Sequence, residues 1–281
     1  SFSSVKMKIV TATLFIKQID TDGHQPLFLL CDDGQKYYTK YLNSFDKKEL
    51  QCLVYEMLAT ELLKTLGIPC ANHSLVKIPP ILISKEIKYA NSYKRSKLAW
   101  GSQEVVSADL VTQFSIPTHK NLFKMIANPE DVLKIAIFDL WTDNADRRED
   151  NYNLLKKEEL GKIQILPIDH ATLFGGFNRL HTFSEKDSCT IHNKLVFSEF
   201  YKNTVKHISV EKQLDIAENF LNLLTQIKIK EITHEVFFFF SESWEHNENL
   251  KERIEKFLLS DFRMKSLHNL VHTILPLNSK K

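Results

Sequence analysis

Alternating apolar and polar positions at the start of the chain predict a small sheet. In residues 5–17, Val5, Met7 and Ile9 alternate with lysines, and β-branched residues continue the pattern. Two further strands are indicated at residues 26–31 and 35–42, and the turn between them is tight. These three strands therefore form an antiparallel meander. Further strand patterns, around a Pro-Pro bend, occur at residues 73–77 and 79–87.

Apolar residues with a helical period predict one long helix after the meander and several helices later in the chain. Residues 46–66 carry an apolar face, and Gly67 ends this helix. A second apolar helix begins near Pro129 and runs to Trp141. The same period recurs at residues 210–228, 232–245, 248–260 and 262–275. This order predicts an α+β fold with a sheet-rich first part and a mainly helical second part.

A polar segment at residues 143–151, which holds three Asp and two Asn, follows the helix that ends at Trp141. Two short strands come next, at residues 152–155 and 163–168, with Gly161 in the turn between them. The second strand is followed at once by Asp169. Because paired strands lie side by side, this hairpin brings Asn151 and Asp169 to the same end.

The spacing of these polar residues fits phosphoryl transfer. Such sites use an Asp that orients the attacking hydroxyl, an Asn five residues later that holds one Mg²⁺, and a second Asp that holds the metal bridging the phosphates. Asp146, Asn151 and Asp169 stand in this relation. Mg²⁺ takes hard oxygen ligands of this kind. One alternative is a solvated loop whose polar side chains cap backbone groups. A calcium loop is a second and less favoured alternative, because the acids do not follow the D-x-[DN]-x-[DN]-G pattern with its closing Glu.

Composition indicates an ordinary globular protein. The 281 residues suffice for two lobes, and 37 basic against 35 acidic residues give a net charge of +2, which predicts neither a nucleic-acid nor a membrane-surface partner. No apolar run reaches the roughly 18 residues of a membrane span, and no signal peptide is visible. The four scattered cysteines, without C-x-x-C spacing, indicate reduced thiols rather than zinc ligands. We therefore expect a cytoplasmic location.

The motif Asn144-x-Asp146-Arg147-x-x-x-Asn151-x-Asn153-Leu154-Leu155, followed by Ile168-Asp169-His170, resembles the catalytic core of the HipA-like kinases. The resemblance is to the compact branch, distantly similar to the phosphatidylinositol kinases, and it covers residues from about 5 to about 175. It implies a two-lobed protein-kinase-like fold. We expect residues 1–107 to form the small lobe with the phosphate clamp, and residues 108–281 the helical lobe with the catalytic loop and metal ligands.

The resemblance also assigns a phosphate clamp to the first lobe. Tyr38-Thr39-Lys40 matches the nucleotide lysine of the family, although a strand lysine of this kind can also face solvent. Glu56 and Glu61 are both candidates for the acid that pairs with Lys40, and the resemblance favours Glu56. On the later helix, which runs from near Pro129 to Trp141, Asp139 is expected to be a buried acid paired with Arg147 or a backbone N–H.

Nucleotide contacts are expected from two further segments. The chain has only 7 Gly and no G-x-G-x-x-G cradle. The family also lacks that cradle, so Gly23, His24 and Gln25 are expected to supply phosphate-binding N–H groups, with a plain hairpin loop as the alternative. Residues 98–106 resemble the family's edge strand before the hinge, which places adenine near Glu104, Val105 and Val106.

Together these patterns predict an ATP- and Mg²⁺-dependent kinase that phosphorylates Ser or Thr of a protein, with Lys40, Asp146 and Asn151 in catalysis. The resemblance also permits a toxin-type kinase restrained by an antitoxin-like partner. Two alternatives stay open: a catalytically inactive nucleotide-binding or interaction module, and a kinase of a lipid or small molecule.

Overall fold

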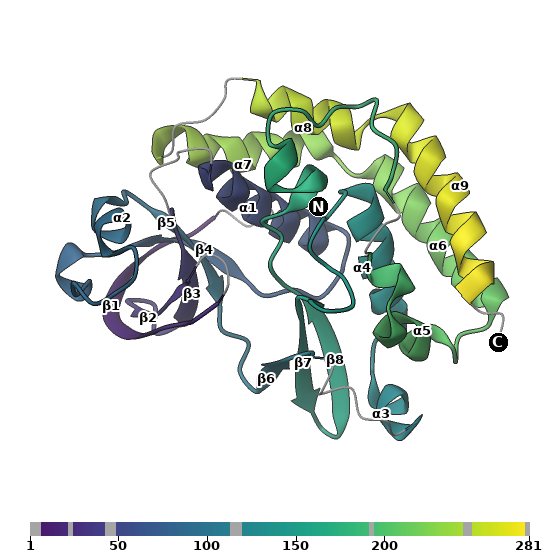
Figure 1. The fold of residues 1–281 in the computed structure, drawn as a ribbon, viewed down its shortest axis with the longest axis horizontal. Helices are drawn as coiled ribbons and strands as arrows, with labels where there is room; N and C mark the ends of the chain where they lie inside the picture. The colour runs from purple at the N-terminus through teal and green to yellow at the C-terminus, as the bar shows by residue number, and fades with distance from the viewer. Residues whose placement is uncertain are drawn as a thin grey trace. The chain divides into compact units, whose positions relative to one another are not determined.

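The computed structural model describes residues 7–21, 25–42, 49–112, 120–190, 194–243 and 249–278. The chain forms two compact units (Figure 1). The first comprises Ser1–Thr60, Ala71–Val105 and His234–Asn247, and the second comprises Glu61–Cys70, Val106–Thr233 and Glu248–Lys281. The lobe boundary expected at residue 107 stays a prediction.

Five strands of the first unit close into a barrel in the order β1-β2-β3-β5-β4. β1 pairs with β4 in parallel, and the other neighbours pair antiparallel. The barrel interior is filled by apolar side chains such as Val10, Leu29 and Val76. The strands are β1 (Ile9–Gln18), β2 (Leu27–Cys31), β3 (Lys36–Lys40), β4 (His73–Lys77) and β5 (Ala99–Gln103).

Two expectations for this unit were wrong. The segment 79–87 is not a strand: Pro80–Leu82 forms a 3-10 turn, in which the Ile83 N–H donates to the Pro80 carbonyl oxygen at 3.1 Å. Consecutive prolines lack the N–H groups that a ladder needs, which explains the difference. Strand β5 is not an edge strand, because it lies between β3 and β4 and pairs with both.

The second unit holds a three-stranded antiparallel sheet in the order β6-β7-β8. β6 (Ala108–Leu110) was not expected from the sequence, and β7 (Leu154–Glu159) is longer at its polar end than expected. β8 spans Lys162–Pro167. Leu154 is paired with Pro167, so the residues before β7 lie beside those after β8.

Helices make up most of the second unit. α4 (Pro129–Trp141) buries an almost continuous apolar run, and α6 (Val210–Gln226) and α9 (Asp261–Asn278) run side by side. α5 (Glu199–Val205) and α8 (Leu250–Leu258) complete the helical part with the short α3 (Lys120–Met125). α1 (Leu50–Thr65) and α7 (Ile229–Ser243) contribute residues to both units, and α2 (Ala90–Arg95) belongs to the first.

The described helices include none with the length and apolarity needed to cross a lipid bilayer. All four cysteines lie in described segments and none forms a disulfide. Burial raises the pKa of the Cys31 thiol to about 12 and that of Cys70 to about 11, so both thiols stay protonated at neutral pH.

Candidate active site

An ion pair between β3 and α1 is the central polar feature of the first unit. Lys40 is the last residue of β3, and its Nζ donates to Glu56 Oε1 at 2.7 Å. The Glu56 side chain is 1% exposed and that of Lys40 is 11% exposed. The Lys40 ammonium also lies 5.8 Å from the centre of the Trp100 ring, which faces it from β5. A lysine amine that is hydrogen-bonded to a buried carboxylate is fixed in position.

The loop after α4 gathers amide groups around one carboxylate. Asp146 Oδ2 accepts hydrogen bonds from Asn151 Nδ2 at 2.9 Å and from Asn153 Nδ2 at 3.2 Å. Asn153 Nδ2 also approaches the Asp146 carbonyl oxygen at 3.3 Å. The loop therefore folds back so that its fifth and seventh residues after Asp146 return to that side chain.

Arg147 ties this loop to the end of β8. Its Nη1 donates to the carbonyl oxygens of Tyr152 and Asn153, and its Nη2 donates to the Ile168 carbonyl oxygen at 3.2 Å. The same Nη2 lies 3.0 Å from His170 Nε2. Contacts to residues on both sides of Asp169 thus hold that residue next to the loop of Asp146.

Asp139 supports the arginine from within α4. Its Oδ2 lies 2.8 Å from Arg147 Nε, and both side chains are fully buried. The contact is an ion pair rather than an aligned hydrogen bond, since neither atom has a hydrogen-bond partner among the described residues. Asn144 Nδ2 donates to Asp139 Oδ1 at 3.0 Å. Burial raises the pKa of the Asp139 carboxyl, whereas the charge of Arg147 and the Asn144 amide oppose that rise.

Several backbone positions in this region are in the left-handed conformation. Asp143, Asn153 and Asp169 have φ values of 49°, 45° and 56°. Asp and Asn tolerate this conformation better than most residues, and such positions collect at functional sites. The Ile168 N–H donates to the Asn153 carbonyl oxygen at 2.9 Å, which extends the β7–β8 pairing to the residue before Asp169.

A second buried ion pair comes from the segment after Asp169. Lys194 Nζ donates to Asp143 Oδ1 at 2.9 Å and to the Asn144 carbonyl oxygen at 2.5 Å. Thr190 Oγ1 donates to the same Asp143 oxygen at 2.5 Å. Sequence reasoning missed Lys194, because a single lysine about 50 residues from its partner carries no local signal. Asn153 and His170 lay within the quoted motif but received no role.

The residues expected to contact nucleotide phosphates and adenine are only partly described. Gly23 and His24 lie outside the described residues. Gln25 is buried, has φ of 46°, and its backbone N–H donates to Thr21 Oγ1 at 3.4 Å. The Glu104 N–H donates to the Lys36 carbonyl oxygen at 2.8 Å, and Glu104 also pairs with Lys36 Nζ at 3.4 Å.

Between Val105 and Val106 the chain makes one of its passages from the first unit to the second. Val106 is 69% exposed. The adenine contacts expected at residues 104–106 stay a prediction.

The donor set of the second unit suits a hard divalent cation. Asn151 uses its Nδ2 as the donor to Asp146, so its amide oxygen is the atom that can serve as a ligand. Asp169 provides a carboxylate. Amide and carboxylate oxygens are the ligands that Mg²⁺ takes from proteins, with phosphate and water in the other positions.

Comparison with known proteins places the chain in a family. The HipA-like kinase family matches the sequence over residues 13–260. Among solved structures, the Helicobacter pylori proinflammatory kinase CtkA aligns over 92% of this chain and 94% of its own, with 12% identity and a TM-score of 0.54. This likeness and the order of elements confirm the expected α+β, protein-kinase-like fold.

Two structures of the Golgi casein kinase, one with Mn and ADP bound, align over 96% of this chain and 72% of their own. Their identity is 11%, and TM-scores of 0.37 and 0.36 are too low to establish a shared fold. No curated protein matches the sequence. Because the family match spans most of the sequence, the chain belongs to the HipA-like kinase family.

Proposed function

We propose that this kinase uses ATP and Mg²⁺ to transfer the γ-phosphoryl group to a Ser or Thr hydroxyl of a protein. One observation carries the proposal: Asn151 and Asp146 are joined by a 2.9 Å hydrogen bond in a loop that Arg147 fastens to both neighbours of Asp169. Catalysis of phosphoryl transfer is mainly positioning and charge neutralisation, so such a fixed set of oxygens is what the chemistry needs.

Asp146 has the role of orienting the attacking hydroxyl. Both amide donors, Asn151 and Asn153, bind its Oδ2. Oδ1 is therefore the oxygen that would accept the hydrogen bond of the substrate hydroxyl. The two amides fix the carboxylate plane, which keeps the attacking group in one orientation.

Asn151 and Asp169 have the role of metal ligands, and Lys40 that of a phosphate ligand. When bound, Mg²⁺ neutralises charge on the phosphates and fixes their orientation. The Lys40 amine, oriented by Glu56, would bind the α- and β-phosphates of ATP, as the corresponding lysine does in protein kinases.

The test compares purified full-length variants in an ATP transfer assay with radiolabelled γ-phosphate. Asp146→Ala and Asp169→Ala are expected to abolish transfer while circular dichroism stays unchanged. Asp150→Ala is the matched control, because Asp150 lies in the same loop with a side chain that is 67% exposed. Full activity in either of the first two variants would contradict the proposed roles.

A nucleotide-binding module without transfer is the second candidate. The Gln25 N–H donates within its own loop, to Thr21, so in this conformation it does not point to a ligand. ATP binding without turnover, with or without candidate acceptor proteins, would favour the module. Phosphopeptide mass spectrometry after expression of the wild type and of Asp146→Ala would identify a protein acceptor, and co-purification would reveal an antitoxin-like partner.

A further inference from the structure

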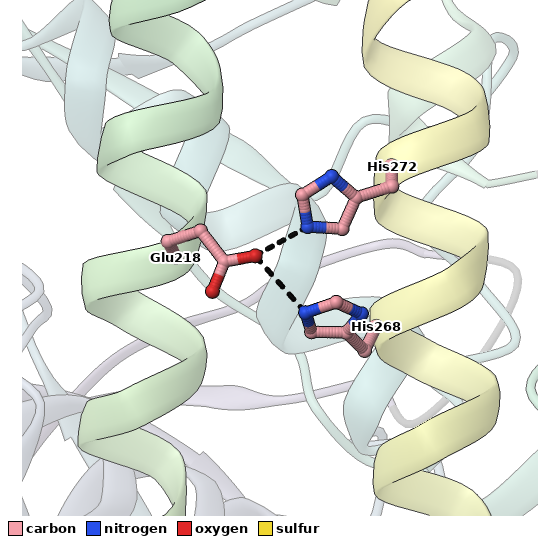
Figure 2. Close-up of side chains that lie close together, drawn as sticks. All are labelled: Glu218, His268 and His272. Carbon is pink, nitrogen blue, oxygen red and sulfur yellow. Dashed lines mark hydrogen bonds and ion pairs between the residues drawn. The ribbon is translucent and has the colours of Figure 1, made fainter.

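Two histidines and a glutamate meet between α6 and α9. Glu218 lies on α6, and His268 and His272 lie on α9 (Figure 2). The two helices pack against each other, and each buries apolar residues on its inner side, among them Ala217, Leu221, Leu267 and Val271. The cluster is therefore built on two packed helices rather than on loops.

The three side chains converge on a single point. Residues four apart lie on the same face of a helix, so His268 and His272 project together from α9. Figure 2 shows both rings directed at the carboxylate: His268 Nε2 lies 3.0 Å from Glu218 Oε1, and His272 Nε2 contacts the same oxygen. One ligand atom from each residue falls within 4.8 Å of the others.

Three potential ligand atoms meet at this point. The ring centroids of His268 and His272 are 4.4 Å apart, and both Nε2 atoms face the same oxygen of Glu218. Hydrogen bonds from rings that carry their proton on Nε2 can satisfy this oxygen without a metal. A divalent cation would use the same geometry, because it accepts a lone pair from each of the three groups.

We propose that Glu218, His268 and His272 bind one divalent transition-metal ion, with Zn²⁺ as the best match. Two imidazoles and one carboxylate form a known Zn²⁺ ligand set with an open fourth position. Oxygen-preferring Mg²⁺ would not select two imidazoles.

The ion would require only a small adjustment. Zn–N and Zn–O bonds of about 2.0–2.2 Å in a tetrahedral site hold the ligand atoms somewhat farther apart than the direct contacts found without metal. The side chains of His268, Glu218 and His272 are 50%, 40% and 36% exposed, so they have room to move. With water in the fourth position, the ion would cross-link α6 to α9 and stabilise that helix pair. This site is independent of the proposed phosphoryl transfer.

The experiment titrates the chelator-treated full-length protein with Zn²⁺ by calorimetry. Excess Mg²⁺ is present to occupy sites made only of oxygen ligands. The wild type is expected to bind one tight equivalent. His268→Ala/His272→Ala and the shape-conserving Glu218→Gln are expected to lower affinity by at least about 100-fold, because loss of a direct ligand exceeds the ~10–100-fold effect of groups one shell farther out.

The matched control is His207→Ala/Glu211→Gln, which changes an exposed histidine and an exposed glutamate near the start of α6. It should bind Zn²⁺ like the wild type. Zn²⁺ should also raise the melting temperature of the wild type and of the control variant, but not that of the ligand variants. Co²⁺ should give the visible absorption of a tetrahedral site only with the wild type and the control variant. Equal Zn²⁺ affinity in wild type and Glu218→Gln, or no bound equivalent in the wild type, would show a surface ion pair only and overturn the proposal.

Discussion

Asp139 and Arg147 form a buried ion pair, and this pair also holds the loop of Asp146 in place. The acid is buried in α4, and the guanidinium that it holds donates to the carbonyl oxygen of Tyr152 just before β7 and to that of Ile168 just after β8. Removing one partner of a buried pair leaves an uncompensated charge where water cannot reach it. The position of Asp146 therefore depends on an acid that need not touch any substrate.

We predict that Asp139→Asn lowers the free energy of unfolding by about 3–5 kcal/mol, the usual cost of breaking a buried ion pair. Glu159→Gln is the control, because its pair with Lys157 is largely exposed and should contribute less than about 1 kcal/mol. Urea denaturation of both variants measures the difference. A loss for Asp139→Asn as small as that of the control would show that the buried pair does not support the loop.

Asp33 in the β2–β3 hairpin gives the first unit a pH-dependent contribution to stability. Burial alone would raise the pKa of its carboxyl, but Lys8, the Gln35 N–H and the Tyr37 hydroxyl together lower it below 3.8. A lowered pKa in the folded state means that the stabilisation is present above the unfolded pKa and lost as pH falls through the folded one.

Asp33→Asn should therefore lower the free energy of unfolding by about 1.5–3 kcal/mol at pH 7, a typical value for hydrogen bonds to a charged group. The difference from the wild type should begin to shrink as pH drops below about 4, the ordinary pKa of this carboxyl in the unfolded chain, and should disappear below its lowered pKa in the folded state. Denaturant unfolding at a series of pH values checks this. If the difference in the free energy of unfolding were as large at pH 2.5 as at pH 7, packing around Asp33 and not its charge would be the cause.

At the scale of elements, local pattern predicted most of the secondary structure. The alternation in β1 to β3 and the helical period of α1, α4, α6 and α9 each give a strong signal within one segment. Ser198 caps the start of α5, because its Oγ accepts the Tyr201 N–H at 3.1 Å, and a serine before a helix is a sequence signal for a helix start. β7 extends through polar residues because its ladder with β8 continues beyond the buried part, and polarity alone suggested a shorter strand.

Barrel closure could not be read from any segment. The parallel pairing of β1 with β4 joins residues more than 60 positions apart, as in Ile9 with Leu75. The same holds for β5 between β3 and β4. Period and turn chemistry act over a few residues, whereas such pairings depend on the packing of the whole unit.

The loop after β8 contains a glycine that its conformation requires. Gly176 has φ of 76° and ψ of −162°, a region that only glycine occupies readily. A Cβ there would lie 3.3 Å from the Ala145 Cβ, next to Asp146. Gly176→Ala should cost about 1–3 kcal/mol and lower the transfer rate, measured by unfolding and by the radiolabel assay.

Gly161→Ala is the matched control for that change. Its φ is 72° in the β7–β8 turn, and an added Cβ would meet no described atom within 4 Å. It should cost about 1 kcal/mol and leave transfer unchanged. If the Gly176 and Gly161 variants had equal transfer rates, the conformation of the loop at Gly176 would not matter for catalysis.

At the scale of the whole molecule, some residues of the candidate site are close together in the sequence and others are far apart. Asp146, Asn151 and Asp169 could be proposed together because a loop and a hairpin connect them. The pairing of Lys40 with Glu56 required the family resemblance to choose between two glutamates. Lys194 with Asp143, and Glu218 with two histidines on α9, join distant segments, so only coordinates reveal them.

Binding of Mg·ATP should raise the stability of the folded molecule, since a ligand that binds only the folded state stabilises it by RT ln(1 + [L]/Kd), about 2.7 kcal/mol at 100 times Kd. We predict a clear rise in melting temperature with Mg·ATP that EDTA abolishes. Lys40→Met and Asp169→Ala should each lose most of this rise, because one removes the proposed phosphate ligand and the other a proposed metal ligand.

The relevant quantity is the rise that the ligand causes in each variant, since Lys40→Met also changes a buried ion pair and will shift the melting temperature without ligand. Asp150→Ala should keep the full rise, because its side chain is exposed in the same loop. A full rise in Asp169→Ala together with lost transfer would assign Asp169 to the chemical step rather than to metal binding. A full rise in Lys40→Met would remove Lys40 from the nucleotide site and leave its pair with Glu56 a structural contact.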